Sequence, residues 1–199
     1  MSLTIVIEGG SKGNESVEKK GFSVFFGKVC AGSRPRVKLA GGRGQAMKAF
    51  LDEHRMGNDV VLLIDAEGPC NHDTAHSFLV ATAVDHGVHQ IANANVDDVH
   101  LMVQVMESWL FADPAGVKSR VRHLSDETLA SELRRRGGNL ELIPKPDAIR
   151  LFEEACGSKY RKVSHLEFIG QIDPVKVEAG SAFAAALFRR LRGEESVWP

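Results

Sequence analysis

Paired cysteines, a strong net charge and a long apolar run are all missing from this sequence. The three cysteines, Cys30, Cys70 and Cys156, are odd in number and form no Cys-x-x-Cys pair, which argues against a disulfide framework and a thiolate zinc site. The formal charge of −1 excludes a globally basic nucleic-acid binder, although a local basic groove stays open. No window approaches the ~20 apolar residues of a membrane span, and the first residues lack a signal-peptide pattern. We therefore expect a soluble, cytoplasmic protein with reduced thiols and no membrane contact.

Short apolar runs alternate with helical patterns in the first part of the chain. The strongest run is 59–65 (Asp-Val-Val-Leu-Leu-Ile-Asp), which is apolar on both faces like a central parallel strand covered by helices. Strands are predicted at 3–8, 36–40, 59–65 and 99–105, and helices at 14–30 with Asn14 as N-cap, at 43–55, and at 71–86 ended by Gly87. This alternation predicts an α/β fold with an open, mainly parallel four-stranded sheet flanked by helices.

The pattern becomes helical after about residue 124. Helix-like stretches are predicted at 126–136, 146–156, 165–170 and 181–192. With 199 residues, of which 43% are hydrophobic, one domain with a sizeable core is the default expectation. We therefore expect residues 1–124 to form the α/β core and residues 125–199 to form a helical extension packed on it as a single structural unit.

Carboxylates follow two of the predicted strands. Glu8 ends the first strand, and Asp65 and Glu67 end the third. Ligands of open parallel sheets bind at the carboxyl ends of the strands, and a buried strand that ends in two acids is costly unless their charge is compensated. Residues two apart on a strand point the same way, so these two acids converge if the extended geometry persists. Grouped oxygen ligands suit Mg or Mn, whereas solvent-facing acids at strand ends are the ordinary alternative.

Glu107 is a candidate fourth carboxylate, because it follows the fourth predicted strand. It would complete the metal site or bind a second ion, as in two-metal phosphoryl-transfer sites. The alternative is that residues 106–113 form a packing turn, with Trp109 and Phe111 in the core and Asp113 capping the next segment. The sequence favours neither interpretation.

Four further residues are candidates for phosphate binding. Gly9 and Gly10 open the first predicted helix, where backbone N–H groups can hold a phosphate, and Lys12 adds charge. Arg43 lies at the carboxyl end of the second strand, within reach of a phosphate beside the metal. The loop is not a P-loop, since no Gly-Lys-Ser/Thr follows, and a turn that serves only the fold explains the glycines at least as well.

Other polar clusters have ordinary explanations. His72 and His76 have a zinc-binding spacing, but the His-Glu-x-x-His pattern is absent, so surface or partly buried histidines are favoured. Solubility is the usual explanation of basic runs. Such runs comprise Arg34, Arg36 and Lys38, then Lys118, Arg120 and Arg122, then Arg134 to Arg136, then Lys159, Arg161 and Lys162, and finally Arg189 and Arg190.

A strand that ends in Glu-Gly and a later strand that ends in Asp-x-Glu resemble the Toprim fold of primases, topoisomerases and OLD-type nucleases. More specifically, four segments resemble a Toprim-like bacterial family, domain-of-unknown-function family 4276. These segments are Val6–Gly13, Asp65–Pro69, Met106–Asp113 and Ile172–Pro174. The resemblance spans nearly the whole chain.

The resemblance implies a Toprim-like core with metal-dependent cleavage or transfer at phosphodiesters. It also implies an ATPase partner of the kind found in OLD-like anti-phage systems. By position, Glu8 matches the Toprim glutamate, a general acid/base, and Asp65 and Glu67 match the Asp-x-Asp pair that holds the metal. Glu67 departs from the commoner Asp, and its longer side chain leaves the coordination of the ion open.

Three functions follow as hypotheses. The first is an Mg- or Mn-dependent nuclease or related phosphotransfer enzyme that acts on nucleic acid. The second is a non-catalytic, Toprim-shaped subunit that docks an ATPase and binds nucleic acid or nucleotide. The third is hydrolysis or transfer on a small nucleotide. The sequence leaves the oligomeric state open.

Overall fold

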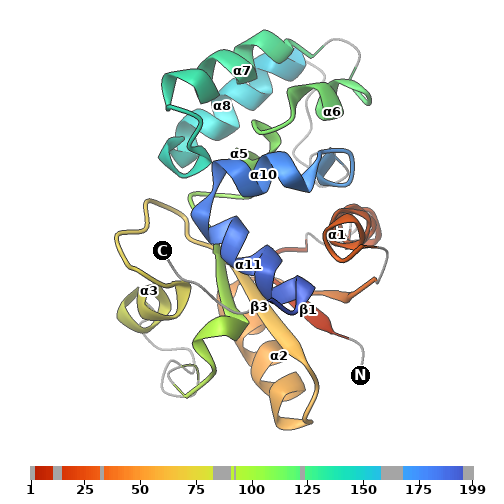
Figure 1. Ribbon diagram of the computed structural model, residues 1–199, viewed down its shortest axis with the longest axis vertical. Coiled ribbons are helices and arrows are strands. Elements are labelled where there is room, and N and C mark those ends of the chain that lie inside the picture. The colour runs from red at the N-terminus through yellow and green to blue at the C-terminus, as the bar shows by residue number, and fades with distance from the viewer. Residues whose placement is uncertain are drawn as a thin grey trace.

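The structure is a computed structural model that describes residues 3–10, 15–31, 34–82, 91, 93–121, 124–157 and 168–194. In these ranges the chain forms a parallel β-sheet enclosed by helices, with a further layer of helices at one end of the sheet (Figure 1). None of the helices found there is long and apolar enough to cross a membrane.

The sheet contains four strands among the described residues, in the order β2-β1-β3-β4, and every neighbouring pair is parallel. The strands are β1 (Thr4–Ile7), β2 (Arg36–Leu39), β3 (Val60–Asp65) and β4 (Val99–Met102). The predicted α/β fold with an open four-stranded sheet flanked by helices is thus confirmed. β4 ends three residues earlier than predicted, because Gln104 has a left-handed backbone with φ of 64° that interrupts the extended chain.

Helices cover both faces of the sheet because its side chains alternate between two apolar clusters. Ile5, Ile7 and Leu63 pack with α1 (Glu15–Val29) and α11 (Ala182–Arg192), whereas Val6 and Leu62 pack with the other two helices. Those two are α2 (Arg43–Arg55) and α3 (Ala75–Thr82), and the short η1 (Val96–Asp98) leads into β4. The result is a three-layer α/β/α arrangement.

A helical layer lies above the carboxyl ends of the strands (Figure 1). It consists of α5 (Glu107–Leu110), α6 (Pro114–Lys118), α7 (Asp126–Arg135), η2 (Leu140–Leu142), α8 (Lys145–Cys156) and α10 (Pro174–Gly180). From α10 the chain returns through α11 to the sheet, where α11 contacts β4. The helices predicted at 126–136, 146–156 and 181–192 are confirmed to within one residue. Asn14, Gly87 and part of the predicted 165–170 helix lie outside the described residues.

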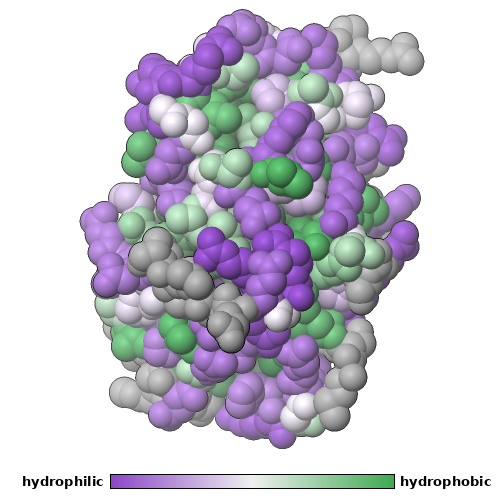
Figure 2. All heavy atoms as spheres, in the orientation of Figure 1, coloured by the Kyte–Doolittle hydropathy of each residue, from purple (hydrophilic) through white to green (hydrophobic). Residues whose placement is uncertain are grey.

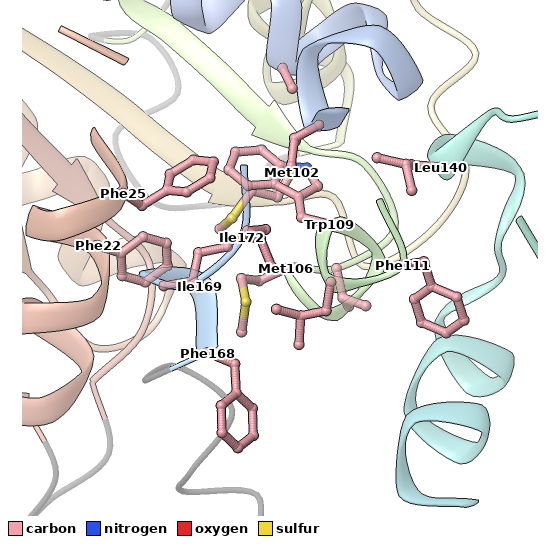
Figure 3. Close-up of a cluster of buried hydrophobic side chains, with 14 of the residues drawn as sticks. Phe22, Phe25, Met102, Met106, Trp109, Phe111, Leu140, Phe168, Ile169 and Ile172 are labelled. Atoms are coloured by element: carbon pink, nitrogen blue, oxygen red, sulfur yellow. The ribbon is translucent and has the colours of Figure 1, made fainter. Parts of the chain in front are cut away.

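One apolar cluster joins the sheet to the helical layer (Figure 3). The Trp109 ring lies 5.7 Å from the Phe25 ring and 5.9 Å from the Phe188 ring, centroid to centroid. Phe111 is also fully buried. The prediction that Trp109 and Phe111 belong to the core is therefore confirmed. The predicted boundary near residue 124 stays a prediction.

Polar side chains predominate on the face of the molecule shown in Figure 2, and apolar ones are scattered among them in small groups. The exposed large apolar residues in the described ranges are Val17, Val24, Met56, Val80, Leu142 and Val175. Single apolar residues on a surface are ordinary, so this face offers no argument for a broad docking surface.

Candidate functional site

The two predicted strand-end acids meet at the topological switch point of the sheet. From β1 the chain continues to β2 on one side, whereas β3 lies on the other side of β1. Glu8 follows β1 directly and its N–H donates to the Leu63 carbonyl of β3 at 2.9 Å, while Asp65 is the last residue of β3. Loops diverge at such a point and leave a crevice outside the carboxyl ends of the strands, which is where open α/β sheets bind ligands. We call this place the carboxyl edge.

Both acids present a carboxylate oxygen that has no hydrogen-bond donor. Glu8 Oε2 and Asp65 Oδ1 are shielded from solvent and accept no hydrogen bond from any described residue. Buried oxygens of this kind normally have a donor or a cation beside them, because an uncompensated carboxylate in a protein interior is costly. The two orphaned oxygens are therefore the strongest sign of a ligand at the carboxyl edge.

Arg43 brings a guanidinium to the same place. It is the first residue of α2, and its Nη2 donates to the Asp65 carbonyl at 2.6 Å. Its Nε lies 3.7 Å from Glu8 Oε2, too far for a hydrogen bond, and Nε is itself buried without an acceptor among the described groups. The sequence correctly placed Arg43 beside the acids, and the side chain retains hydrogen-bonding capacity there.

The pKa values of both acids are raised, because burial disfavours their charged forms more than the nearby cations favour them. Burial raises the pKa of Asp65 well above its usual range, and the negative charges of Glu107, Glu8 and Glu67 raise it further, opposed by Lys145. Burial also raises the pKa of Glu8, while the charge of Arg43 acts in the opposite direction. Perturbed acids in a crevice are typical of functional sites, although structural clusters produce them too.

Glu67 does not follow the expected geometry. The strand ends at Asp65, and Glu67 has a left-handed backbone with φ of 64°, so the extended conformation that would align the two side chains does not persist. Its side chain is half exposed and forms an ion pair with Lys145 of the helical layer. The extended geometry on which the expected convergence of Asp65 and Glu67 depended is therefore absent, although Glu67 remains close enough to raise the pKa of Asp65.

Glu107 combines the two interpretations that the sequence left open. Glu107 is buried at the start of α5. After burial, its negative charge is the largest cause of the raised pKa of Asp65. The same segment also packs, since Trp109 and Phe111 are buried. Asp113 binds Lys176 at 2.6 Å and the Asp173 N–H at 3.1 Å, so it anchors the start of α10 and makes no side-chain cap for α6.

The donor chemistry of the carboxyl edge fits a hard divalent cation. Carboxylate oxygens are the ligands that Mg and Mn prefer, and two of them, Glu8 Oε2 and Asp65 Oδ1, lack a hydrogen-bond donor. Across the described part of the chain, no three side chains of His, Cys, Asp or Glu are grouped as a ready-made metal site. The charges of Glu8, Glu67 and Glu107 all act on Asp65, and Glu67 forms an ion pair with Lys145.

The predicted phosphate-binding glycines are partly engaged. The Gly9 N–H donates to the Gly41 carbonyl at 2.7 Å, and the Gly41 N–H donates to the Gly9 carbonyl at the same distance. The N–H of Gly9 is thus already used, whereas the role of Gly10 stays a prediction and Lys12 lies outside the described residues. Both Gly9 and Gly41 have positive φ values, 138° and 68°, which a side chain would strain.

His72 and His76 do not lie one turn apart on a helix, as a zinc-binding pair would require. Helix α3 begins at Ala75, so His72 precedes it and the two histidines do not share a helix face. His76 Nε2 lies 3.0 Å from the Ile91 carbonyl, and the His72 ring packs against Phe78. Both histidines therefore have structural contacts.

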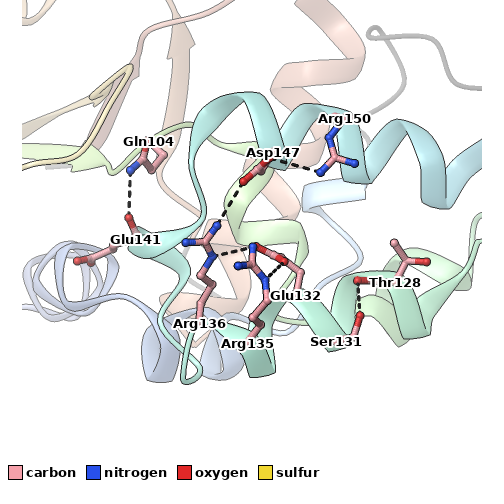
Figure 4. Close-up of polar contacts among 9 residues, drawn as sticks. All are labelled: Gln104, Thr128, Ser131, Glu132, Arg135, Arg136, Glu141, Asp147 and Arg150. Carbon is pink, nitrogen blue, oxygen red and sulfur yellow. Dashed lines mark hydrogen bonds and ion pairs between the residues drawn. The ribbon is translucent and has the colours of Figure 1, made fainter.

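The basic residues of α7 are engaged within the helical layer (Figure 4). Arg135 and Arg136 both bind Glu132, and Arg136 also contacts Asp147 at 3.3 Å. A groove of about 440 Å³ lies next to them and has no acid in its lining. Its lining residues are Phe111, Ala112, Pro114, Ala130, Leu133, Arg134, Gly137 and Gly138. Arg122, Lys159, Arg161 and Lys162 lie outside the described residues.

Two residues that shape the carboxyl edge, Lys145 and Gln104, were not predicted from the sequence. Gln104 accepts a hydrogen bond from the Lys145 N–H at 3.3 Å. Its Nε2 donates to the Glu141 carbonyl at 3.2 Å, the contact drawn in Figure 4. Its own N–H donates to the Gly68 carbonyl at 3.3 Å. Gln104 thus joins the helical layer to the ends of β3 and β4. No local pattern reveals these contacts, because the partners are far apart in the chain.

Comparisons of the chain with protein-family models, curated proteins and solved structures find no match. The resemblance to a Toprim-like family stays a prediction.

Proposed function

We propose that the protein is an Mg- or Mn-dependent enzyme that processes phosphodiesters, a nuclease-like protein of Toprim type. One observation carries the proposal: two buried carboxylate oxygens, on Glu8 and Asp65, lack a hydrogen-bond donor at the switch point of a parallel sheet. A divalent cation would compensate the charge of these acids, and divalent ions bound by carboxylates are the usual solution for phosphate chemistry.

The roles of the residues follow from their positions. Asp65, Glu8 and Glu107 would hold the ion, with Glu67 as a further ligand. The bound ion would supply charge stabilisation to the phosphoryl group. Glu8, whose pKa is raised by burial, is suited to take up a proton during the reaction. Arg43, with its unused Nε, would neutralise a phosphate oxygen.

The substrate and partners belong to the same proposal. A nucleic-acid strand is the first candidate substrate, and an ATPase of an anti-phage type is the candidate partner in the cytoplasm. A small nucleotide is the second candidate substrate. The small-nucleotide substrate is favoured by the ion pairs that the arginines at the end of α7 form with Glu127, Glu132 and Asp147. Because these arginines are paired within the protein, they offer a nucleic-acid polymer little unpaired positive charge.

Calorimetric titration with Mn²⁺ tests the site without knowledge of the substrate. We expect the wild type to bind, and Asp65→Asn and Glu8→Gln to weaken binding by at least about tenfold, because each removes a ligand charge. Asp52→Asn is the matched control, since Asp52 is an exposed acid of α2 paired with Lys48. Circular dichroism checks that each variant is folded.

Activity separates the candidate functions. Cleavage of single- or double-stranded DNA or RNA that needs Mg²⁺ or Mn²⁺ and is lost in Asp65→Asn supports the nuclease. Turnover of free nucleotides alone supports the second substrate. If Asp65→Asn binds Mn²⁺ and acts as the wild type does, the enzyme proposal fails. Co-purification with an ATPase without metal-dependent activity would instead indicate a non-catalytic subunit.

A further inference from the structure

One ion pair links the helical layer directly to the carboxyl edge. Lys145, the first residue of α8, contacts Glu67 Oε2, and these residues are 78 positions apart in the chain. The same lysine lowers the pKa of Asp65, so its charge is felt at the centre of the acidic site. The ammonium therefore compensates part of the negative charge that a divalent cation would also compensate.

The position of Lys145 is not explained by helix stability. The N-terminal turn of a helix carries partial positive charge, which disfavours a lysine there. The Lys145 N–H donates to Gln104 Oε1 at 3.3 Å, a backbone hydrogen bond that does not require a lysine side chain. Lys145 thus lies in the first turn of α8, where its charge is unfavourable, and its side chain points to the Glu67 carboxylate.

The backbone on the other side of the contact is strained. Glu67 and Gln104 both have φ of 64°, which costs a non-glycine residue free energy, and the Gln104 N–H binds the Gly68 carbonyl. Strain of this kind persists where the surrounding structure enforces it, and it collects at functional sites. The strained pair fixes the two elements that bring Lys145 and Glu67 together.

We propose that Lys145 is a positioning residue that holds Glu67 in the absence of metal and is exchanged for the divalent cation when the ion binds. The inference rests on the proposed function. The ammonium beside Glu67 Oε2 neutralises part of the charge of this ligand and repels a divalent ion bound at the same carboxylate. The Lys145–Glu67 pair therefore competes with the ion and lowers the affinity of the site for it.

Mn²⁺ calorimetry on matched variants tests this competition. In Lys145→Met we expect the affinity for Mn²⁺ to rise roughly threefold to tenfold, the effect of removing a partly exposed ion pair and a nearby positive charge. Lys145→Arg should keep the affinity near that of the wild type. Lys118→Met is the charge-matched control, because Lys118 forms a similarly exposed pair with Asp126 elsewhere in the helical layer.

A double-mutant cycle shows whether Lys145 acts through Glu67. In a Glu67→Gln background, Lys145→Met should raise the affinity by clearly less than in the wild type, because the competing pair is already absent. A purely structural role of Lys145 would lower the melting temperature and would not raise ion affinity.

The outcomes distinguish the two proposals. If the wild type binds Mn²⁺ and Asp65→Asn does not, yet Lys145→Met binds no more tightly, the exchange is overturned while the metal site stands. The exchange is also overturned if Lys118→Met raises the Mn²⁺ affinity as much as Lys145→Met does. It is overturned too if Lys145→Met raises the affinity as much in the Glu67→Gln background as in the wild type. If neither the wild type nor Lys145→Met binds, the metal site itself fails, and the exchange fails with it.

Discussion

At the scale of single residues, Asp65 is the group whose charge conflicts most with its surroundings. Its pKa is raised well above the ordinary value of 3.8, first by burial and then by Glu107, Glu8 and Glu67. The folded protein therefore binds this proton more tightly than the unfolded chain does. Between 3.8 and the raised pKa the folded state carries more protons, so the free energy of unfolding falls as the pH rises through that window.

Replacing Asp65 with Asn should stabilise the protein in metal-free buffer. We expect the free energy of unfolding at about pH 8 to rise by about 1–2 kcal/mol, as when a functional site is relieved of a destabilising group. The gain should shrink as the pH falls through the raised pKa towards the ordinary value of 3.8, because the folded wild type then carries the proton and its carboxyl is neutral. Urea unfolding across this range measures it.

Asp52→Asn is the control, because the pKa of Asp52 is lowered whereas that of Asp65 is raised. A hydrogen bond from Lys48 is the main cause that lowers the pKa of the exposed Asp52, so neutralising it should give no stabilisation at high pH. If Asp65→Asn is no more stable than the wild type at about pH 8, the carboxylate of Asp65 is better compensated than its surroundings indicate.

The acids that belong to strand ends were predictable, and their partners were not. Glu8 and Asp65 directly follow apolar runs, so the parallel topology alone brings them to the same edge of the sheet. The direction of Glu67 depends on a left-handed φ that its residue type does not announce. The Lys145 contact depends on how two distant segments pack, which no spacing in the sequence encodes.

At the scale of elements, α11 is fixed at its start by a serine. Ser181 Oγ accepts a hydrogen bond from the Ala184 N–H at 3.0 Å and donates to Glu141 Oε1 at 2.7 Å. Ser125 occupies the same N-cap position on α7, but its side chain makes no cap bond to the helix backbone and instead accepts a hydrogen bond from the Thr128 hydroxyl at 2.8 Å. The two serines form a matched pair for testing what the cap contributes.

Ser181→Ala should lower the free energy of unfolding by about 1–2 kcal/mol, because it removes an N-cap bond and one donor to a partly buried carboxylate. Ser125→Ala should lower it by only a few tenths, roughly 0.5 kcal/mol or less. Urea unfolding of both variants gives the comparison. Equal losses would mean that the Ser181 bonds add nothing beyond an ordinary helix start.

Element types were more predictable than their ends. The helix at 126–136 was found to within one residue, since its apolar spacing and acidic first turn are local properties. The start of α3 was placed four residues too early, at 71, because residues 71–74 are polar and form a bend before the helix. The fourth strand was predicted to extend to residue 105, because the apolar pattern continues after Met102. Val103 and Val105 are buried, but they do not belong to the strand.

At the scale of the whole molecule, the last helix completes the first layer. α11 packs on β4 and contacts α1, so the end of the described chain covers the same sheet face as its beginning. Phe188 contacts both Phe25 and Trp109, which joins α1, α5 and α11 in one apolar cluster. The composition predicted one sizeable core, but it gave no sign that the final helix would supply part of the sheet layer.

A fragment of residues 1–124 should therefore fail to fold cooperatively. Without α11, the face formed by Ile5, Ile7, Val61 and Leu63 loses a covering helix, and the ring contacts of Phe188 with Phe25 and Trp109 disappear. We expect the fragment to show a broad urea transition and weak near-ultraviolet circular dichroism, in contrast to the single sharp transition of the full chain. The complementary fragment 125–199 should behave likewise, because its amphipathic helices α8 and α11 bury their apolar faces against the rest of the molecule. A sharp transition in the 1–124 fragment would mean that the α/β core holds its own packing, and the helices after it would then be an accessory to that core.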